Sequence, residues 1–174
     1  IVEFAKLHNA VIYVNHLSNM RNEFTVEGNL LLTLITQDKF DETFAPDILI
    51  SIGGQTGDYP LYHKLTEGNT SFEHWRICPS GEVVDTYDRL TKVFECSVDE
   101  FFGSIKSGGT NNEYLGVWKD AISKLTTNID LPLSNAYTAQ QLHNLIPEDS
   151  CVNFAILNSL RMWNLFHFEN IVHC

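Results

Sequence analysis

The sequence is short of positive charge. It has 11 lysines and arginines against 22 aspartates and glutamates, which gives a formal net charge of −11 at pH 7. A protein that binds nucleic acid needs a basic face to neutralise phosphates, and an anionic membrane surface attracts basic proteins for the same reason. The charge balance therefore argues against nucleic acid and against a membrane as partners.

The sequence also lacks a long apolar run and a recognisable export signal. Its longest apolar stretch lies near residues 29–35, far short of the roughly 20 residues that a membrane-spanning helix requires. The start of the chain has neither an initiator methionine nor the basic region of a signal peptide. We therefore expect a cytoplasmic protein. We also expect the chain to be a fragment of a longer one, because it ends within a predicted strand.

Cysteine is scarce and is not arranged for metal binding. The cysteines stand at positions 78, 96, 151 and 174, none forms a CxxC pair, and none has metal-ligand spacing to a histidine. Cys96 and Cys151 flank apolar runs, which favours reduced thiols in the core. No Ser/His/Asp or Cys/His arrangement with a recognisable nucleophile turn is present either. We therefore predict no metal site in this chain, and its residue patterns alone name no catalytic nucleophile.

What the sequence does contain is an alternation of strand-like and helix-like segments. Apolar, β-branched runs predict strands at 10–16, 44–54, 72–79, 92–96 and 151–159, and the start of another at 170–174. Helices are predicted at 27–38, 59–66, 97–105, 111–125 and 134–147. The run 44–54 is continuous, which predicts a strand covered on both faces. The alternation predicts an α/β fold with a doubly wound, Rossmann-like parallel sheet.

Local signals support two of these helices. Ser97 with Glu100 three residues later forms a capping box at the start of segment 97–105. Five side chains of segment 111–125 share one helical face, which predicts that they pack in the core. They are Tyr114, Leu115, Trp118, Ile122 and Leu125. The segment 126–137 that follows has the composition of a linker, which predicts one complete domain followed by the start of another.

Ligands of an open parallel sheet bind beyond the carboxyl ends of its strands. The loops concerned are 16–23, 53–59, 79–89 and 157–163. Loop 53–59 carries three glycines before a helix, which could admit a phosphate. It matches neither GxGxxG nor a Walker loop, and Asp58 would repel an anion, so a plain tight turn is the other interpretation. Arg21 could grip a carboxylate or phosphate, or be an ordinary surface arginine.

Several stretches, taken in order, resemble one known family. They are NHLSNMR, PDILISIGG leading into TGDYPLYHKL, EHWRICPSGEVVDTYDRLTKVFECSVDEFF, and AILNSLRMWNLF. These stretches resemble the 2-succinyl-5-enolpyruvyl-6-hydroxy-3-cyclohexene-1-carboxylate (SEPHCHC) synthases, which are thiamine-diphosphate enzymes of menaquinone biosynthesis. The resemblance runs over most of the chain, and EHWxxxPxGEVxD and the final strand with Asn-Ser are its more specific parts.

The resemblance implies a place within a three-domain enzyme. Residues 1–128 would be the central domain, and residues 129–174 a linker and the truncated beginning of the diphosphate-binding domain. The family's GDG motif for diphosphate and magnesium is absent, and its catalytic glutamate lies on a missing domain. The complete enzyme would bind thiamine diphosphate and Mg²⁺, form a homo-oligomer, decarboxylate 2-oxoglutarate and add the product to isochorismate. The fragment would bind no cofactor and catalyse nothing.

The resemblance also implies residues at the edge of the active site. Asn158 and Ser159 match the family's Asn-Ser pair. Family members place an arginine after three further residues, where this chain has Trp163. Arg161 lies two residues earlier and is the implied substitute.

A second departure concerns the substrate-facing turn. Asp58 and Tyr59 stand where the family has lysine or lysine-arginine, although His63 and Lys64 lie nearby and a shifted alignment would change the match. A lost charge-assisted contact costs roughly 1.5–3 kcal/mol. An alternative is therefore a related thiamine-diphosphate enzyme that acts on another 2-oxo acid. A nucleotide-binding module is a further alternative, from a different functional class.

Overall fold

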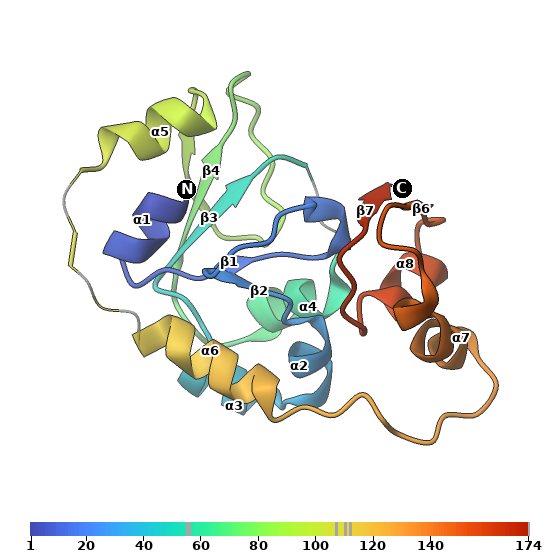
Figure 1. The fold of residues 1–174 in the computed structure, drawn as a ribbon. Coiled ribbons are helices and arrows are strands. Elements are labelled where there is room, and N and C mark those ends of the chain that lie inside the picture. The colour runs from blue at the N-terminus through green and yellow to red at the C-terminus, as the bar shows by residue number, and fades with distance from the viewer. Residues whose placement is uncertain (55–56, 107, 110, 112, 174) are drawn as a thin grey trace.

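The computed structural model describes residues 1–54, 57–106, 108–109, 111 and 113–173. Helices and strands alternate along the chain (Figure 1). The helices are α1 (Val2–Leu7), η1 (His16–Ser18), α2 (Asn29–Leu34), α3 (Gln37–Thr43), α4 (Tyr59–Glu67), α5 (Val98–Ser104), α6 (Glu113–Ser123), α7 (Asn135–Leu142), η2 (His143–Leu145) and α8 (Asn158–Trp163), of which η1 and η2 are 3₁₀ helices. The strands are β1 (Ile12–Tyr13), β2 (Thr25–Val26), β3 (Ile48–Ile52), β4 (Glu73–Ile77), β5 (Leu90–Phe94), β6 (Cys151–Asn153) and β7 (Ile171–His173).

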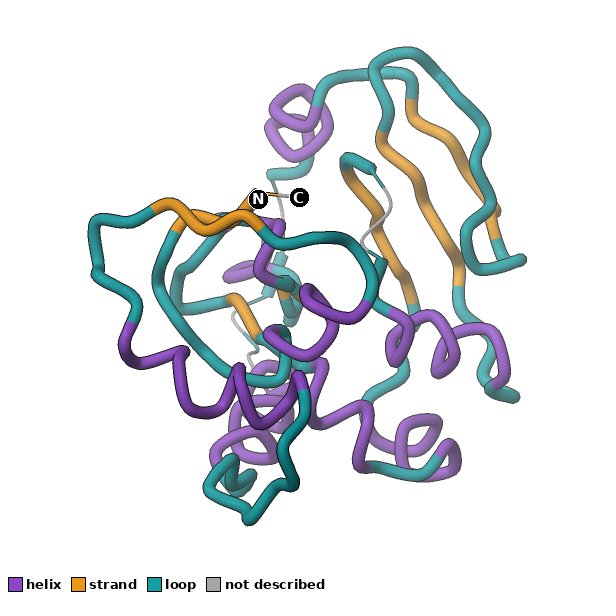
Figure 2. Tube along the Cα trace, turned by 90° about the vertical axis from the view of Figure 1, so that its right-hand side faces the viewer, coloured by secondary structure: helices purple, strands orange, loops and turns teal. Residues whose placement is uncertain are grey.

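The strands pair in parallel, which confirms the predicted α/β class with a parallel sheet. The longest strands form one sheet in the order β3-β4-β5, while β1-β2 and β6-β7 form two short sheets beside it (Figure 2). Strands β3 and β4 run in register from the Ile48–Glu73 pair to the Ile52–Ile77 pair. Parallel pairing places the carboxyl ends of these strands at one edge, so the turn after β3 lies beside the loop after β4.

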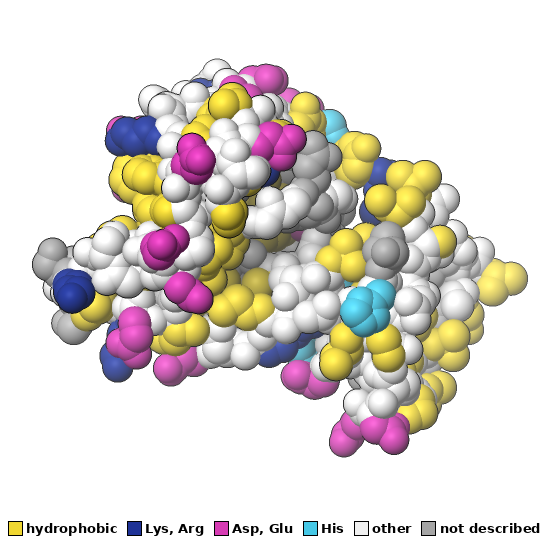
Figure 3. Space-filling model, turned by 90° about the horizontal axis from the view of Figure 1, so that it is seen from above, with side chains coloured by type: hydrophobic (Ala, Val, Ile, Leu, Met, Phe, Trp, Pro, Cys, Tyr) yellow, Lys and Arg dark blue, Asp and Glu magenta, His cyan; other side chains and the backbone are white. Residues whose placement is uncertain are grey.

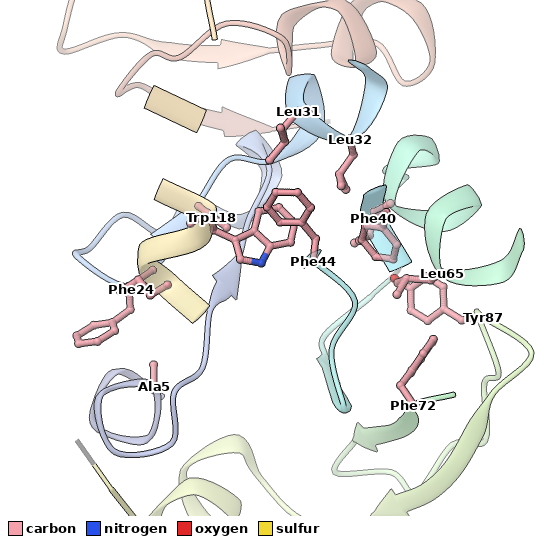
Figure 4. Close-up of a cluster of buried hydrophobic side chains, with 13 residues drawn as sticks. Ala5, Phe24, Leu31, Leu32, Phe40, Phe44, Leu65, Phe72, Tyr87 and Trp118 are labelled. Atoms are coloured by element: carbon pink, nitrogen blue, oxygen red, sulfur yellow. The ribbon is translucent and has the colours of Figure 1, made fainter. Parts of the chain in front are cut away.

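The main core lies where helices α2, α3, α4 and α6 meet (Figure 4). The Trp118 ring of α6 packs edge-on against Phe44, with ring centroids 4.9 Å apart, and the Tyr114 hydroxyl donates to the carbonyl of Phe44. Leu115 and Trp118 are buried in this cluster, and Tyr114, Ile122 and Leu125 pack against it. The predicted apolar face of this helix is therefore confirmed.

The capping box at the start of α5 is also confirmed. The Ser97 Oγ accepts from the Glu100 main-chain N–H at 3.2 Å, and the Glu100 carboxylate accepts from the Ser97 N–H at 2.8 Å. The cap fixes where α5 begins, and Phe101 then packs on Phe94 of β5 with ring centroids 4.8 Å apart. A local sequence signal thus sets the position of a helix against the sheet.

Some element boundaries differ from the prediction because polar side chains interrupt the apolar pattern. The strand predicted at 10–16 is short because the Asn15 side chain accepts from the Leu17 N–H and starts η1. The helix predicted at 27–38 is two helices, because the Thr36 hydroxyl accepts from the Lys39 N–H and caps α3 separately. Strand β2 lies between the predicted loop 16–23 and the predicted helix 27–38, in residues for which the sequence predicts no element.

Two predictions about burial are wrong. Strand β3 is not covered on both faces, because Ile48 and Ile52 on one face are 45% and 39% exposed while Leu49 on the other packs on the core. Cys151 is exposed rather than in the core, because β6 belongs to a two-stranded sheet with an open face, and Cys96 is only partly buried. Both are free thiols; Cys174 lies outside the described residues.

Residues 126–133, within the predicted linker, contain neither helix nor strand. The Gln140 amide of α7 donates to the carbonyls of Thr127 and Ile129, which holds this segment against α7. Seen from above, hydrophobic side chains gather on the right, over the part of the chain that follows this linker (Figure 3). Across the described residues, we find no helix with the length and apolar character to cross a membrane.

Candidate functional site

Residues 1–128 and residues 129–173 meet through a buried histidine. His16 is 1% exposed, and its Nε2 lies 2.8 Å from the carbonyl of Trp163 and 2.9 Å from that of Phe166. Because both partners are carbonyls, Nε2 carries the proton and donates. Burial is the main cause that lowers the pKa of His16 below 6.5, so the ring is neutral at pH 7. This residue therefore joins the two parts without a charge.

Asn19 extends the same contact. Its amide donates to the carbonyl of Val172 and its side-chain oxygen accepts from the Val172 N–H, both at 2.8 Å. The side chain thus pairs with β7 as a neighbouring strand would, and the left-handed backbone at Asn19 (φ 46°) is one that asparagine adopts readily. We call His16 and Asn19, with Trp163, Phe166 and Val172, the His16 contact.

Arg21, the candidate ligand group of loop 16–23, is paired inside the protein. Its Nε lies 3.0 Å from a carboxylate oxygen of Glu27, and the other oxygen of Glu27 lies 2.8 Å from Nδ1 of His167. The hydrogen bond with Glu27 is the main cause that raises the pKa of His167 to about 9. A cavity of about 390 Å³ lies beside these residues, and its described lining also includes Lys119 and the apolar side chains of Ile122, Leu165 and Phe166. Arg21 and His167 are paired with Glu27, and the Lys119 amine donates to the carbonyl of Glu23, so we do not assign a ligand to the cavity.

Two of the predicted site residues meet, although they lie far apart in the sequence. The guanidinium carbon of Arg161 lies 3.9 Å from the centroid of the Tyr59 ring. Tyr59 is the first residue of α4, and Arg161 lies on α8. The pair lines a pocket of about 170 Å³ together with Gly57, Ile156, Leu157 and Leu160. We call the pairing of Tyr59 with Arg161 the Arg161 contact.

Asn158 and Ser159 begin α8, on the same short helix as Arg161. Neither side chain has a hydrogen bond to another described residue, so both are available to bind a ligand. The residue before them, Leu157, has φ 81° and ψ −118°, a backbone conformation that L side chains rarely adopt. The start of α8 is therefore strained beside the predicted site residues.

Asp58 lies in the predicted turn, but its side chain faces inward. It is 4% exposed, and it accepts from the Leu61 N–H, the Tyr13 hydroxyl and the Asn29 amide at 3.1, 2.9 and 3.1 Å. Burial raises the pKa of Asp58, and the three hydrogen bonds oppose that rise. The carboxylate caps α4, so it fixes the turn and is turned away from any ligand there.

The partners of Asp58 are the residues that sequence reasoning missed. Tyr13 lies 45 residues from Asp58 and Asn29 lies 29 residues from it, so no local pattern could reveal them. Burial and the neighbouring Asp58 raise the pKa of Tyr13 well above 10, which keeps its hydroxyl a donor. Gln55 and Thr56 of the glycine turn lie outside the described residues.

Trp163, which stands in the place of the family's arginine, packs in a second apolar cluster. Its ring centroid lies 4.9 Å from that of Phe154 and 5.6 Å from that of Phe168. Residues two positions apart on a helix point to roughly opposite faces, so Arg161 is turned toward the pocket while Trp163 is turned away from it. In the described part of the chain, no three His, Cys, Asp or Glu side chains gather where they could hold a metal ion.

Comparison with known proteins shows a distant relationship. No family model matches the chain. A protein of Bacteroides thetaiotaomicron named 2-succinyl-5-enolpyruvyl-6-hydroxy-3-cyclohexene-1-carboxylate synthase is 26% identical over 183 residues, which cover 97% of this chain and 32% of that protein. Two proteins of the same name from strains of Bacteroides fragilis are 25% identical over 137 residues, or 77% of this chain and 24% of theirs. The chain spans no more than about a third of the length of these curated relatives, and it is distantly related to the SEPHCHC synthases.

Proposed function

We propose that the chain is part of a thiamine-diphosphate-dependent enzyme of the SEPHCHC synthase type. Residues 1–128 are its central domain, and residues 129–174 are the linker and the beginning of its diphosphate-binding domain. The observation that carries the proposal is the similarity to a named synthase over 97% of the chain. The complete protein would be a cytoplasmic homo-oligomer that decarboxylates 2-oxoglutarate and adds the product to isochorismate.

The surface of residues 129–173 supports the proposed division. Large apolar side chains are exposed over this short segment, more than its own small cluster can bury. They are Ile129, Leu133, Leu142, Leu145, Ile156, Leu157 and Ile171. Exposed apolar surface of this kind marks a contact with further protein. A segment that forms only part of a larger domain would have such a surface.

We place the site of thiamine diphosphate and Mg²⁺ outside this chain. Magnesium bound to a diphosphate is usually held by one or two carboxylates together with the phosphate oxygens. The family's GDG motif, which holds both groups in its members, does not occur in this sequence. In this proposal the cofactor, which supplies the chemistry of decarboxylation when bound, is held by parts of the complete protein outside this chain.

The residues of this chain would bind substrate at the edge of the active site. Arg161 would bind a substrate carboxylate, because a guanidinium forms paired hydrogen bonds with a carboxylate. Asn158 and Ser159 would offer an amide and a hydroxyl from the same helix. Tyr59 would face the same pocket, and Asp58 would hold the turn in place. None of them would be catalytic in the absence of the other domains.

One observation favours the related enzyme that uses a different 2-oxo acid. The pocket has Arg161 as its only cation among the described lining residues, and Trp163 is committed to apolar packing. A substrate with several buried carboxylates needs a donor for each of them. A 2-oxo acid with fewer carboxylates would fit this pocket with a single arginine.

The experiment uses the complete protein with thiamine diphosphate and Mg²⁺. Consumption of 2-oxoglutarate is followed with and without isochorismate, and the product is identified by mass spectrometry. A product with the mass of SEPHCHC supports the proposed reaction. Cofactor binding without use of 2-oxoglutarate, followed by turnover of another 2-oxo acid, supports the second candidate. Failure to bind the cofactor or to convert any 2-oxo acid contradicts both. The variant Arg161→Gln is expected to weaken substrate binding. Lys124→Gln is the matched control, because it removes a positive charge from an exposed side chain directly after α6.

A further inference from the structure

The partners of the four arginines single out Arg161. All four arginines lie in the part of the chain that the structure describes. Arg21 pairs with Glu27, and Arg76 and Arg89 donate to main-chain carbonyls. The guanidinium of Arg161 has no hydrogen bond or ion pair with another described residue, although the chain has 22 acidic residues against 11 basic ones. Among the described residues, none occupies its hydrogen-bond donors, which leaves them available to a ligand.

Tyr59 holds this guanidinium by stacking. The separation of 3.9 Å is shorter than the 5.4 Å between Arg89 and the Phe72 ring. A cation within about 6 Å of an aromatic centroid is attracted by the electrons of the ring face. Stacking uses the flat face of the guanidinium, while its N–H groups point outward in its own plane. Arg161 can therefore stay on Tyr59 and still bind a carboxylate through two N–H groups.

The pocket beside this pair limits what can enter. Apart from Tyr59 and Arg161, the described residues of its lining are Gly57 and the apolar residues Ile156, Leu157 and Leu160. Its volume is about 170 Å³, whereas pockets that enclose a whole small molecule measure about 300–1,000 Å³. It therefore has room for one end of an elongated substrate. An anion that enters apolar surroundings needs a charged partner, and Arg161 provides it.

We propose that Tyr59 is a positioning residue, which fixes the guanidinium of Arg161 so that this arginine binds the carboxylate end of a substrate in the pocket between the 57–59 turn and α8. The proposal rests on the proposed function in taking that substrate to be a carboxylic acid. In this proposal Tyr59 does not contact the substrate itself. Its ring acts by holding Arg161 in position.

The position of Tyr59 is itself fixed from inside the molecule. Tyr59 follows Asp58, whose buried carboxylate caps α4 through the Leu61 N–H and is held by Tyr13 and Asn29. The first turn of α4 is therefore anchored to the core. This arrangement explains why an acidic residue stands in a turn that would bind an anion. The Asp58 carboxylate caps α4 from inside the protein, and Arg161 is the residue that would bind the anion.

The test measures binding of succinate to the complete protein by isothermal titration calorimetry, with neutral succinamide as the ligand control. Tyr59→Leu removes the ring, and Tyr59→Phe keeps the ring while removing the hydroxyl. Because cation–π attraction is worth about 0.5–2 kcal/mol, we expect Tyr59→Leu to weaken succinate binding by about 2- to 30-fold. Tyr59→Phe is expected to bind within about twofold of the wild type.

Two controls separate positioning from a loss of fold. Tyr62→Leu removes an exposed ring from the same helix, and Tyr62 has no stacked arginine among the described residues. It is expected to leave succinate binding unchanged. The NMR signals of the Arg161 side chain give a second measurement. They are shifted by the ring of Tyr59 in the wild type and in Tyr59→Phe, and the shift is expected to vanish in Tyr59→Leu.

The outcomes distinguish this proposal from the proposed function. If Tyr59→Leu binds succinate as tightly as the wild type, or if Tyr59→Phe is as impaired as Tyr59→Leu, positioning by the ring is wrong. If succinate binding falls as expected but the complete protein turns over no 2-oxo acid, positioning of Arg161 holds and the proposed reaction fails. If turnover occurs and Tyr59→Leu raises KM with little change in kcat, both are supported.

Discussion

Two of the contacts between residues 1–128 and residues 129–173, the His16 contact and the Arg161 contact, differ in whether their hydrogen-bond donors are already used within the protein. In the His16 contact, a neutral buried ring and an amide direct their hydrogen bonds to main-chain groups of the other part. In the Arg161 contact, the guanidinium lies on an exposed ring with its N–H groups without a partner among the described residues. The first arrangement holds the two parts together, and the second is suited to binding a ligand. Two of the loops that follow strands, 16–23 and 53–59, thus take part in contacts with different roles.

The largest effect is expected from removing the ring of His16. His16→Ala leaves the carbonyl of Phe166 without its donor and opens a cavity beside Phe168, while the carbonyl of Trp163 still accepts from the Phe166 N–H. An unpaired buried carbonyl and a cavity together cost about 2–4 kcal/mol. We therefore expect the free energy of unfolding to fall by that amount, measured by chemical denaturation of the complete protein. His16→Gln keeps a donor near the position of Nε2 and should recover most of the loss. An unchanged stability in His16→Ala would mean that the two parts are held together elsewhere.

A smaller loss is expected at Asn19. Asn19→Ala removes both hydrogen bonds to the main chain of Val172, which we expect to cost about 1–2 kcal/mol, because each hydrogen bond contributes about 0.5–1.5 kcal/mol. Asn19→Gly is the matched control, since glycine accepts the left-handed backbone and lacks the amide. If the amide matters, glycine loses stability as alanine does. A glycine variant as stable as the wild type would assign the effect to the backbone alone.

A gain in stability is expected next to the Arg161 contact. Leu157 is 54% exposed and its backbone has φ 81°, so Leu157→Gly relieves strain while giving up little burial. Such strain costs about 1–3 kcal/mol, and the greater freedom of glycine in the unfolded chain takes part of the gain back. We expect a net increase of about 1 kcal/mol in the free energy of unfolding. Ile156→Gly, at an exposed neighbour whose backbone has negative φ, should gain nothing.

The smallest effect concerns pH, and the two histidines act in opposite directions. Burial lowers the pKa of His16, so stability falls as the pH drops below about 6.5 and the unfolded chain takes up the proton. The pKa of His167 is raised to about 9, so its contribution is complete below about 6.5 and is lost as the pH rises through 9. Because His167 is an exposed side chain, its contribution should stay under about 1 kcal/mol.

Thermal unfolding from pH 5 to 10 measures both arms. His16→Gln should flatten the acid side of the profile, and His167→Gln should flatten the alkaline side. If neither variant changes the profile, the titration belongs to other groups, and the assignment of these two histidines is wrong.

The sequence predicted the features that depend on near neighbours. The capping box of Ser97 and Glu100 and the apolar face of α6 follow from the spacing of residues on a helix, and the structure confirms both. The α/β class follows from the alternation of apolar runs. Boundaries were less certain, because Asn15 and Thr36 form caps inside segments that looked continuous.

The sequence could not predict contacts between distant residues. Asp58 looked like a ligand group in a turn, and only the fold shows that Tyr13 and Asn29 keep its carboxylate inside. Likewise, the spacing within α8 names Arg161 but says nothing of Tyr59, which lies on α4. The roles of Asn158, Ser159, Arg161 and Tyr59 in binding substrate, and the boundary near residue 128, remain predictions that experiments on the complete protein can test.

The most direct test of the account compares the KM for the 2-oxo acid substrate in two variants of the complete protein. Arg161→Gln removes the cation of the Arg161 contact, and Asn19→Ala weakens the His16 contact. Since a charge-assisted hydrogen bond is worth about 1.5–3 kcal/mol, we predict that Arg161→Gln raises KM by about 10- to 100-fold. Asn19→Ala should leave KM near that of the wild type while it lowers stability. An unchanged KM in Arg161→Gln, or an equal rise in both variants, would contradict the division between a contact that holds the protein together and one that binds substrate.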